Sequence, residues 1–177
     1  MATFGEIWRG LEQAGGGTPY LLLDCAGIDA GASALPRDAC EQLECLFTGD
    51  LAQELADVAP YLGRVKAFDG EAPGVAEDLL KRQVGMLVVL PPGAEGERPT
   101  FSQLHRHFRK FNVIYGPEGK PLFFRYYDPR VIVEVLSVLE PKQLDDFFGP
   151  VDSLVLVDGE ARTVRCYRQG GKLAVQA

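Results

Sequence analysis

The strongest candidates for acid–base or nucleophilic chemistry in this chain are one of its aspartates, its two histidines and its four cysteines. Asp24 follows an apolar run, His105 and His107 are the only histidines, and the thiols are Cys25, Cys40, Cys45 and Cys166. Catalysis would require at least two of these groups to meet in one pocket. A carboxylate at the end of a strand more commonly caps a loop or pairs with an arginine, so a structural role is the preferred interpretation of Asp24.

The spacing of the possible metal ligands does not favour a metal site. Two residues that lie two positions apart on a helix point about 200° apart, so His105 and His107 would not grip the same ion. The cysteines form no C-x-x-C pair, and we expect them to be free, buried thiols. No glycine-rich phosphate loop and no G-x-S-x-G motif is present. We therefore expect no catalytic residue, no metal and no cofactor.

The clearest positive patch combines Arg106, Arg109 and Lys110, which share one face if this segment is helical. The chain as a whole carries a formal net charge of −7, which argues against general binding to nucleic acids or anionic membranes. Charge runs are usually solvated faces, and this is the simpler interpretation. The functional alternative is a secondary contact surface for an acidic segment of a partner.

A second polar group consists of Arg125, Asp128 and Arg130. Arg125 stands in a predicted apolar strand, where an unpaired charge is costly, so we expect it to reach solvent or to pair with Asp24 or Asp128. Asp128 is the expected N-cap of a helix that begins at Pro129. Arg130 would then lie in the first helical turn, where the helix dipole disfavours a cation. We interpret these residues, together with Asp24, as a structural network.

Periodicity predicts the elements that must position these side chains. Strands are expected at residues 20–25 and 85–90, both without alternation and therefore buried on both faces. Further expected elements are helices at 3–14, 49–59, 75–84, 100–111 and 129–140, a short helix ending at 147–150, a strand at 61–68, a hairpin at 113–127, a second hairpin at 154–167, and a last strand at 173–175. The triple glycine at 15–17 is expected to end the first helix.

This order of elements predicts an α/β (α+β) fold, in which helices flank a mixed β-sheet. The strands after Pro150 are expected to form a small C-terminal β-hairpin lobe. The predicted division is a main domain at residues 1–150 and a strand lobe at residues 151–177.

Residues 123–139, with the sequence FFRYYDPRVIVEVLSVL, and the following FFGPV at 147–151 resemble the signature of domain-of-unknown-function family 4123. Residues 20–24 resemble the opening strand of that family, and residues 46–49, 58–62 and 104–111 resemble further segments in the same order. The resemblance covers roughly residues 20–151.

The resemblance implies a function in the bacterial type VI secretion system. Family members act as adaptor chaperones that hold a toxic effector, commonly by its N-terminal part, and help load it onto the spike protein VgrG. It therefore implies a non-catalytic, cytoplasmic protein whose partners are an effector and possibly VgrG. Exposed aromatics and arginines are frequent interface anchors. The candidate contact residues are Tyr61, Arg125, Tyr126, Arg130, Phe147 and Phe148.

Two other classes of function remain open. One is a small cytoplasmic enzyme that uses Asp24, His105 or a cysteine. The other is an immunity-type protein that inhibits an effector, for which an acidic surface would be suitable. The sequence shows no basic n-region followed by an apolar core at its start and no apolar run long enough to span a bilayer, so we expect a cytoplasmic protein.

Overall fold

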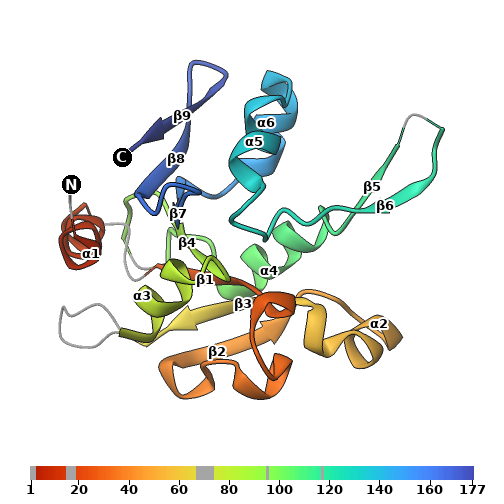
Figure 1. Cartoon of the computed structure of the whole chain (residues 1–177). Helices are drawn as coiled ribbons and strands as arrows, with labels where there is room; N and C mark the ends of the chain where they lie inside the picture. Colours follow the sequence, from red (N-terminus) through yellow and green to blue (C-terminus); the bar gives the residue numbers. More distant parts are fainter. Residues whose placement is uncertain (1–2, 15–18, 67–73, 95, 117) are drawn as a thin grey trace.

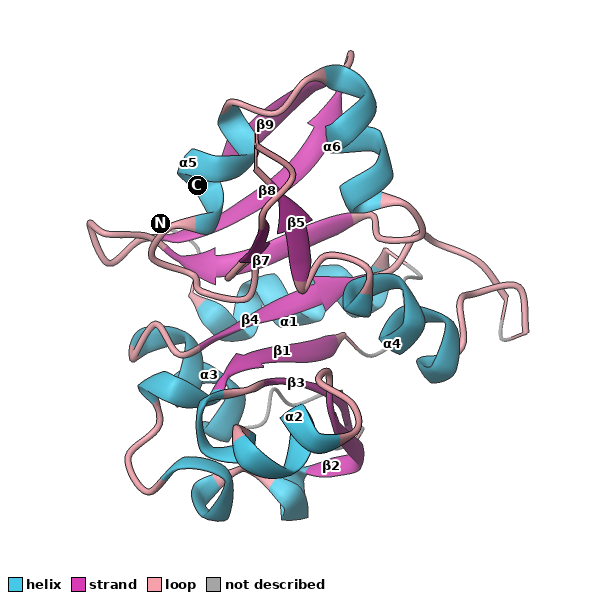
Figure 2. Cartoon of the chain, turned by 90° about the vertical axis from the view of Figure 1, so that its right-hand side faces the viewer, coloured by secondary structure: helices cyan, strands magenta, loops and turns pink. Residues whose placement is uncertain are grey.

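A computed structural model describes residues 3–14, 19–66, 74–94, 96–116 and 118–177. The predicted α+β class is confirmed: helices pack on a seven-stranded sheet of order β2-β3-β1-β4-β7-β8-β9, and a separate two-stranded sheet joins β5 to β6. A mixed sheet was expected, but the strand pairs of the described residues are antiparallel. Figure 2 shows the seven strands one above another, with β2 at the bottom and β9 at the top.

The sheet separates two hydrophobic cores, one on each face. The central strands β1 (Tyr20–Asp24) and β4 (Gly85–Val89) are buried along their whole length, as their unbroken apolar runs predict. Because successive side chains of a strand point to opposite faces, Leu22 enters one core, whereas Leu21 and Leu23 enter the other.

One face is covered by helices α1 (Phe4–Gln13) and α3 (Gly74–Lys81), and the other by α4 (Phe101–Arg109), α5 (Ile132–Ser137) and α6 (Pro141–Phe148). Figure 1 shows α1 and α3 on the left of the sheet and the other three helices on the right. The glycines at 15–17, the expected end of the first helix, lie outside the described residues.

The segment between β1 and α3 is less regular than the sequence predicts. Its described residues contain the edge strand β2 (Cys40–Cys45) and its neighbour β3 (Pro60–Val65). They also form four 3-10 turns: η1 (Cys25–Gly27), η2 (Gly31–Ala34), η3 (Arg37–Ala39) and η4 (Ala56–Val58). The expected helix at 49–59 is only α2 (Asp50–Glu54) followed by η4. Leu51 and Val58 of this segment are exposed, and Leu55 packs against the core.

Helix α4 begins where the sequence predicts. Thr100 and Gln103 form a capping box, in which the side chain of each residue accepts a hydrogen bond from the main-chain N–H of the other. Phe101, Leu104 and Phe108 bury one side of the helix, and the chain then enters the hairpin of β5 (Val113–Tyr115) and β6 (Pro121–Phe123). Figure 1 shows this hairpin projecting away from the sheet and its helices.

The structure corrects the prediction for residues 124–131. The second hairpin strand ends at Phe123, so Arg125 does not lie in a strand, and turns rather than a helix follow it. Asp128 is not a helix N-cap: its Oδ1 accepts the main-chain N–H of Arg130 at 3.0 Å, which closes a local turn. Helix α5 starts only at Ile132, with Val131 as its N-cap, so Arg130 precedes the helix and does not lie in its first turn.

Helix α6 ends at Gly149, as predicted. The φ angle of Gly149 is +44°, and a Cβ atom there would approach the ring of His107 to 2.6 Å, so glycine is required for two reasons. The remaining strands are β7 (Ser153–Val157), β8 (Thr163–Gln169) and β9 (Lys172–Gln176). β7 pairs with β4, so the strands of residues 151–177 continue the main sheet.

Candidate functional site

The hairpin of β5 and β6, called here the arm, exposes apolar side chains on both of its faces. Cross-strand pairing places Val113 opposite Phe123, Ile114 opposite Leu122, and Tyr115 opposite Pro121. Tyr115 is 74% exposed and Phe123 is 59% exposed, although the ring of Phe123 lies 6.0 Å from that of Phe47. Large apolar side chains gathered on one exposed element are typical of an interaction surface.

The arm continues directly from the basic face of α4. Arg106, Arg109 and Lys110 are exposed, as the helical spacing predicts, and Arg109 donates a hydrogen bond to the Thr48 hydroxyl at 3.3 Å. The opposite side of α4 is in the core. The basic face and the arm are therefore consecutive parts of one exposed surface.

At the base of the arm, Arg125 and Arg130 meet Asp24 and Asp128. Arg125 Nη2 lies 2.6 Å from Asp24 Oδ2 and 3.4 Å from Asp128 Oδ2. Arg130 contacts Asp128 at 2.8 Å and Asp24 at 3.7 Å. The expected structural network is thus present, and it ties the segment after β6 to the end of β1. The two carboxylates are buried, whereas both guanidinium groups are about half exposed.

The pKa values of the two carboxylates in this network are shifted in opposite directions. Burial raises the pKa of Asp24, and Arg125 offsets this effect only in part. Asp24 Oδ1 is buried and finds no hydrogen-bond partner among the described residues. Burial alone would also raise the pKa of Asp128, but the hydrogen bonds donated by the side chain and main chain of Arg130 lower it overall. Asp128 is therefore the better-stabilised anion of the two.

Four of the expected contact aromatics are not on the surface. Tyr61, Tyr126, Phe147 and Phe148 are at most 5% exposed, whereas the prediction of partner contact assumed exposed aromatics. Tyr126 stacks on Phe108, and its hydroxyl donates to Asn112 Oδ1 at 3.0 Å. The packing of α4, α5 and α6 against the sheet encloses Tyr126, Phe147 and Phe148, whereas Tyr61 lies in the core on the opposite face. The sequence could not reveal this packing. Arg125 and Arg130 remain accessible.

The exposed residues of the arm were missed as contact candidates. The hairpin itself was predicted, but Val-Ile-Tyr and Leu-Phe show no polar alternation, a pattern typical of buried strands. The absence of a polar face on a short hairpin is the one sequence signal that could have indicated a partner.

The two histidines make structural contacts, and three of the four cysteines are buried. The Nε2 atom of His105 lies 2.8 Å from the main-chain oxygen of Cys45, and that of buried His107 lies 2.8 Å from the oxygen of Phe147. Burial lowers the pKa of His107 and raises the pKa of the Cys25 thiol to about 11. All four cysteines are free. Within the described ranges, no three His, Cys, Asp or Glu side chains gather closely enough to hold a metal ion.

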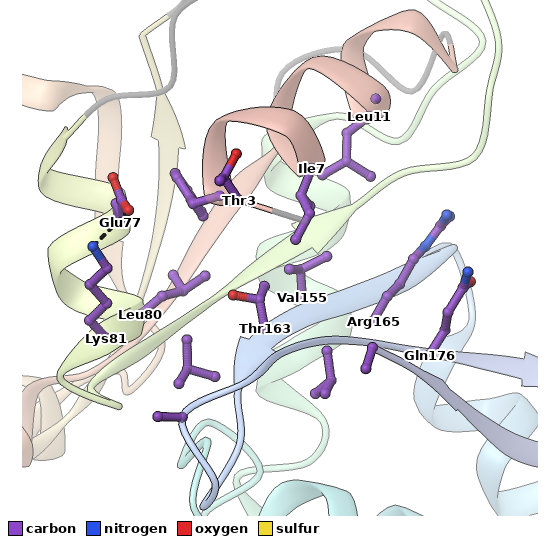
Figure 3. Close-up of a pocket in the computed structure, with 16 residues that line it drawn as sticks. Thr3, Ile7, Leu11, Glu77, Leu80, Lys81, Val155, Thr163, Arg165 and Gln176 are labelled. Carbon is purple, nitrogen blue, oxygen red and sulfur yellow. Dashed lines mark ion pairs between the residues drawn. The ribbon is translucent and has the colours of Figure 1, made fainter. Parts of the chain in front are cut away.

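A separate cavity of about 520 Å³ lies between α1, α3 and the β7–β9 strands. Figure 3 shows Ile7, Leu11 and Val155 at its wall, with Arg165 and the Glu77–Lys81 ion pair at its margins. It lies on the face of the sheet opposite to α4. None of the residues singled out from the sequence lines it.

Comparison with known proteins gives one match. The sequence model of a family described as "Domain of unknown function (DUF4123)" matches residues 19–146, which is more than half of the chain. No curated protein and no solved structure matches. Among the described residues, no helix has both the length and the apolar character needed to cross a membrane.

Proposed function

The chain belongs to the DUF4123 family, and from this membership we propose that it is an adaptor chaperone that binds a type VI secretion effector and helps load it onto the VgrG spike. The inference that the partner is a type VI secretion effector rests on the resemblance of residues 123–151 to the signature of that family. The adaptor would make and break no covalent bond, so its function depends on a surface rather than on a pocket.

The observation that carries this proposal is the arm. A two-stranded hairpin is marginally stable by itself in water, and this one also exposes most of its apolar side chains. Burial of this apolar surface against a partner contributes a favourable free energy of about 25 cal/mol per Å² of buried area. Protein binding is the function that best accounts for its exposure.

The surroundings of the side chains that were candidates for catalysis also favour a binding function over an enzymatic one. Asp24 is paired with Arg125, His105 contacts a main-chain oxygen, and the pKa of the Cys25 thiol is raised to about 11 by burial. A nucleophilic cysteine requires a lowered pKa, which is the opposite shift.

The proposed contact surface comprises the arm, the basic face of α4, and the exposed sides of Arg125 and Arg130. Under this proposal the buried aromatics Tyr126, Phe147 and Phe148 support the surface from beneath. An effector segment, which the family resemblance places in the N-terminal part of the effector, would lie across the arm.

The test is an affinity pull-down of the tagged chain from its native bacterium, grown while the secretion machinery is expressed, followed by mass spectrometry. The proposal requires that one large effector is enriched, with or without VgrG. An enzyme activity of the captured protein that persists in the complex supports an adaptor. A blocked active site would instead indicate the immunity-type inhibitor, and recovery of the chain alone would contradict the proposal.

A further inference from the structure

The two edges of the arm differ in the main-chain groups that they offer. The N–H of Phe124 donates to the oxygen of Asn112, and the N–H of Gly116 donates to the oxygen of Lys120, each at 3.0 Å. Hydrogen-bonded pairs alternate along an antiparallel ladder. Val113 and Tyr115 therefore direct their N–H and C=O groups outward from β5, as Pro121 and Phe123 do from β6.

Only the β6 edge is protected. Pro121 has no N–H to offer, and Lys120 stands beside it. Proteins commonly block exposed edges with proline and lysine, because an open edge templates the addition of another strand. The β5 edge consists of Val113, Ile114 and Tyr115, without either kind of residue. In the part of the chain that the structure describes, no hydrogen bond from outside the arm reaches the main chain of Val113 or Tyr115.

The side chains beside this edge suit an extended apolar segment. Val113 and Tyr115 lie on one face of the arm, and Ile114 lies on the other. A strand added along β5 would place alternate side chains against these two apolar faces. It would also convert a marginal two-stranded ribbon into a three-stranded sheet.

The charge around the arm identifies the kind of segment. Lys120 pairs with Glu118, and Arg125 and Arg130 pair with Asp24 and Asp128. Arg106, Arg109 and Lys110 make no ion pair within the described residues, so the surface beside the arm is positive although the whole chain carries a net charge of −7. This local excess attracts an acidic segment. It also disfavours a second copy of the same chain on this edge, since pairing β5 with β5 would bring two positive surfaces together.

We propose that the open edge of β5 receives an extended segment of the partner protein as a third strand, and that this segment is acidic and apolar at alternate positions. This inference rests on the proposed binding function and specifies how the partner docks.

The probe is a random 12-residue peptide library displayed on phage, selected against the full chain. Strand addition requires enriched peptides in which β-branched or aromatic residues alternate with Asp or Glu and proline is rare. Apolar residues at i, i+3 and i+4, basic peptides, or no enrichment would overturn the inference. The selection does not depend on the native effector, so failure of the pull-down alone would reject the secretion role without rejecting strand addition.

Two substitutions at one position separate main-chain docking from side-chain docking. Tyr115→Pro removes an outward N–H that the arm itself does not use, whereas Tyr115→Ala keeps the N–H and removes the ring. The selected peptide should bind Tyr115→Pro about 3- to 10-fold more weakly than Tyr115→Ala, the size of one net hydrogen bond. Equal affinities for the two variants would contradict the proposed pairing.

Three further measurements complete the test. Circular dichroism and thermal melting must show that Tyr115→Pro retains the fold. Light scattering of the free chain should give a monomer, and a dimer that Tyr115→Pro dissociates would show that a second copy, not a partner, occupies the edge. Peptide binding should weaken as salt is raised, because the attraction to the basic surface is screened.

Discussion

At the scale of single residues, the network between β1 and the segment after β6 is the most informative feature. Asp24 is 1% exposed and depends on Arg125, which reaches it from 101 residues further along the chain. Burial raises the pKa of Asp24, so the folded protein favours the protonated form of this carboxyl group. Its contribution to stability is therefore present below its unfolded pKa and lost as pH rises through the folded pKa.

Replacing Arg125 by alanine should destabilise the protein by about 1–3 kcal/mol at pH 7, because Asp24 then stays buried with only the more distant Arg130 at 3.7 Å as a counter-charge. The loss should shrink as the pH is lowered through the raised pKa of Asp24, since a protonated carboxyl no longer needs a cation. Urea denaturation of wild type and Arg125→Ala across this pH range measures the effect. The matched control is Arg168→Ala, which breaks the exposed pair with Asp145 and should cost about 0–1 kcal/mol. A loss for Arg125→Ala that is the same at every pH would refute the coupling to Asp24.

Asp128 should show the opposite pH dependence. Its pKa is lowered overall, so its contribution to stability is present above its unfolded pKa and lost as pH falls through the folded pKa. The variant Asp128→Asn should be less stable than wild type at pH 7 and should lose less stability on acidification. Thermal melts from neutral to acidic pH test this, and carboxyl NMR titration should place Asp128 below Asp24. The reverse order of the two pKa values would show that the assignment is incorrect.

At the scale of elements, the arm and α4 form one functional unit. The capping box at Thr100 and the buried side of α4 fix the direction of the helix. The arm begins within four residues of the end of α4. The buried face of α4 determines folding, while its basic face and the arm remain available to a partner.

The combined substitution of Tyr115→Ser and Leu122→Ser should abolish partner capture in the pull-down while the melting temperature stays close to that of wild type. Both side chains are more than half exposed, so their loss removes binding surface but little of the core. Val138→Ser is the control, because Val138 is 78% exposed but lies outside the arm. Undiminished capture by the arm variant, or equal loss by Val138→Ser, would place the interface elsewhere.

At the scale of the whole molecule, residues 151–177 complete the sheet on which the helices rest. β7 pairs with the central strand β4, and Leu154, Val155 and Leu156 contribute to the cores on the two faces. The predicted division at residue 150 thus separates strands that share one sheet.

A chain truncated to residues 1–150 should fail to fold into a monomer. Removing β7 exposes the edge of β4 and opens both cores, and an unprotected apolar edge promotes aggregation. Size-exclusion chromatography with circular dichroism checks this, with a chain that lacks only residues 172–177, which include β9, as the milder comparison. A cooperatively unfolding, monomeric 1–150 fragment would show that the two parts are independent domains.

The sequence by itself determined features that depend on local physical chemistry. Thr100 with Gln103 begins α4, Gly149 ends α6, and the unbroken apolar run of Tyr20–Asp24 predicts a strand buried on both faces. Asp24 was one of the alternatives expected for Arg125, beside Asp128 and solvent, because an unpaired charge in an apolar setting is costly, and the structure places Arg125 against both carboxylates.

Exposure was decided only by the tertiary structure. Tyr126 and Tyr115 are both aromatic residues of the same hairpin region, yet Tyr126 is fully buried and Tyr115 is 74% exposed. Which aromatic faces solvent depends on how α4, α5 and α6 pack against strands that are distant in sequence, and no local pattern contains that information. The proposed partner surface therefore became visible only when the arm was seen to stand apart from the sheet.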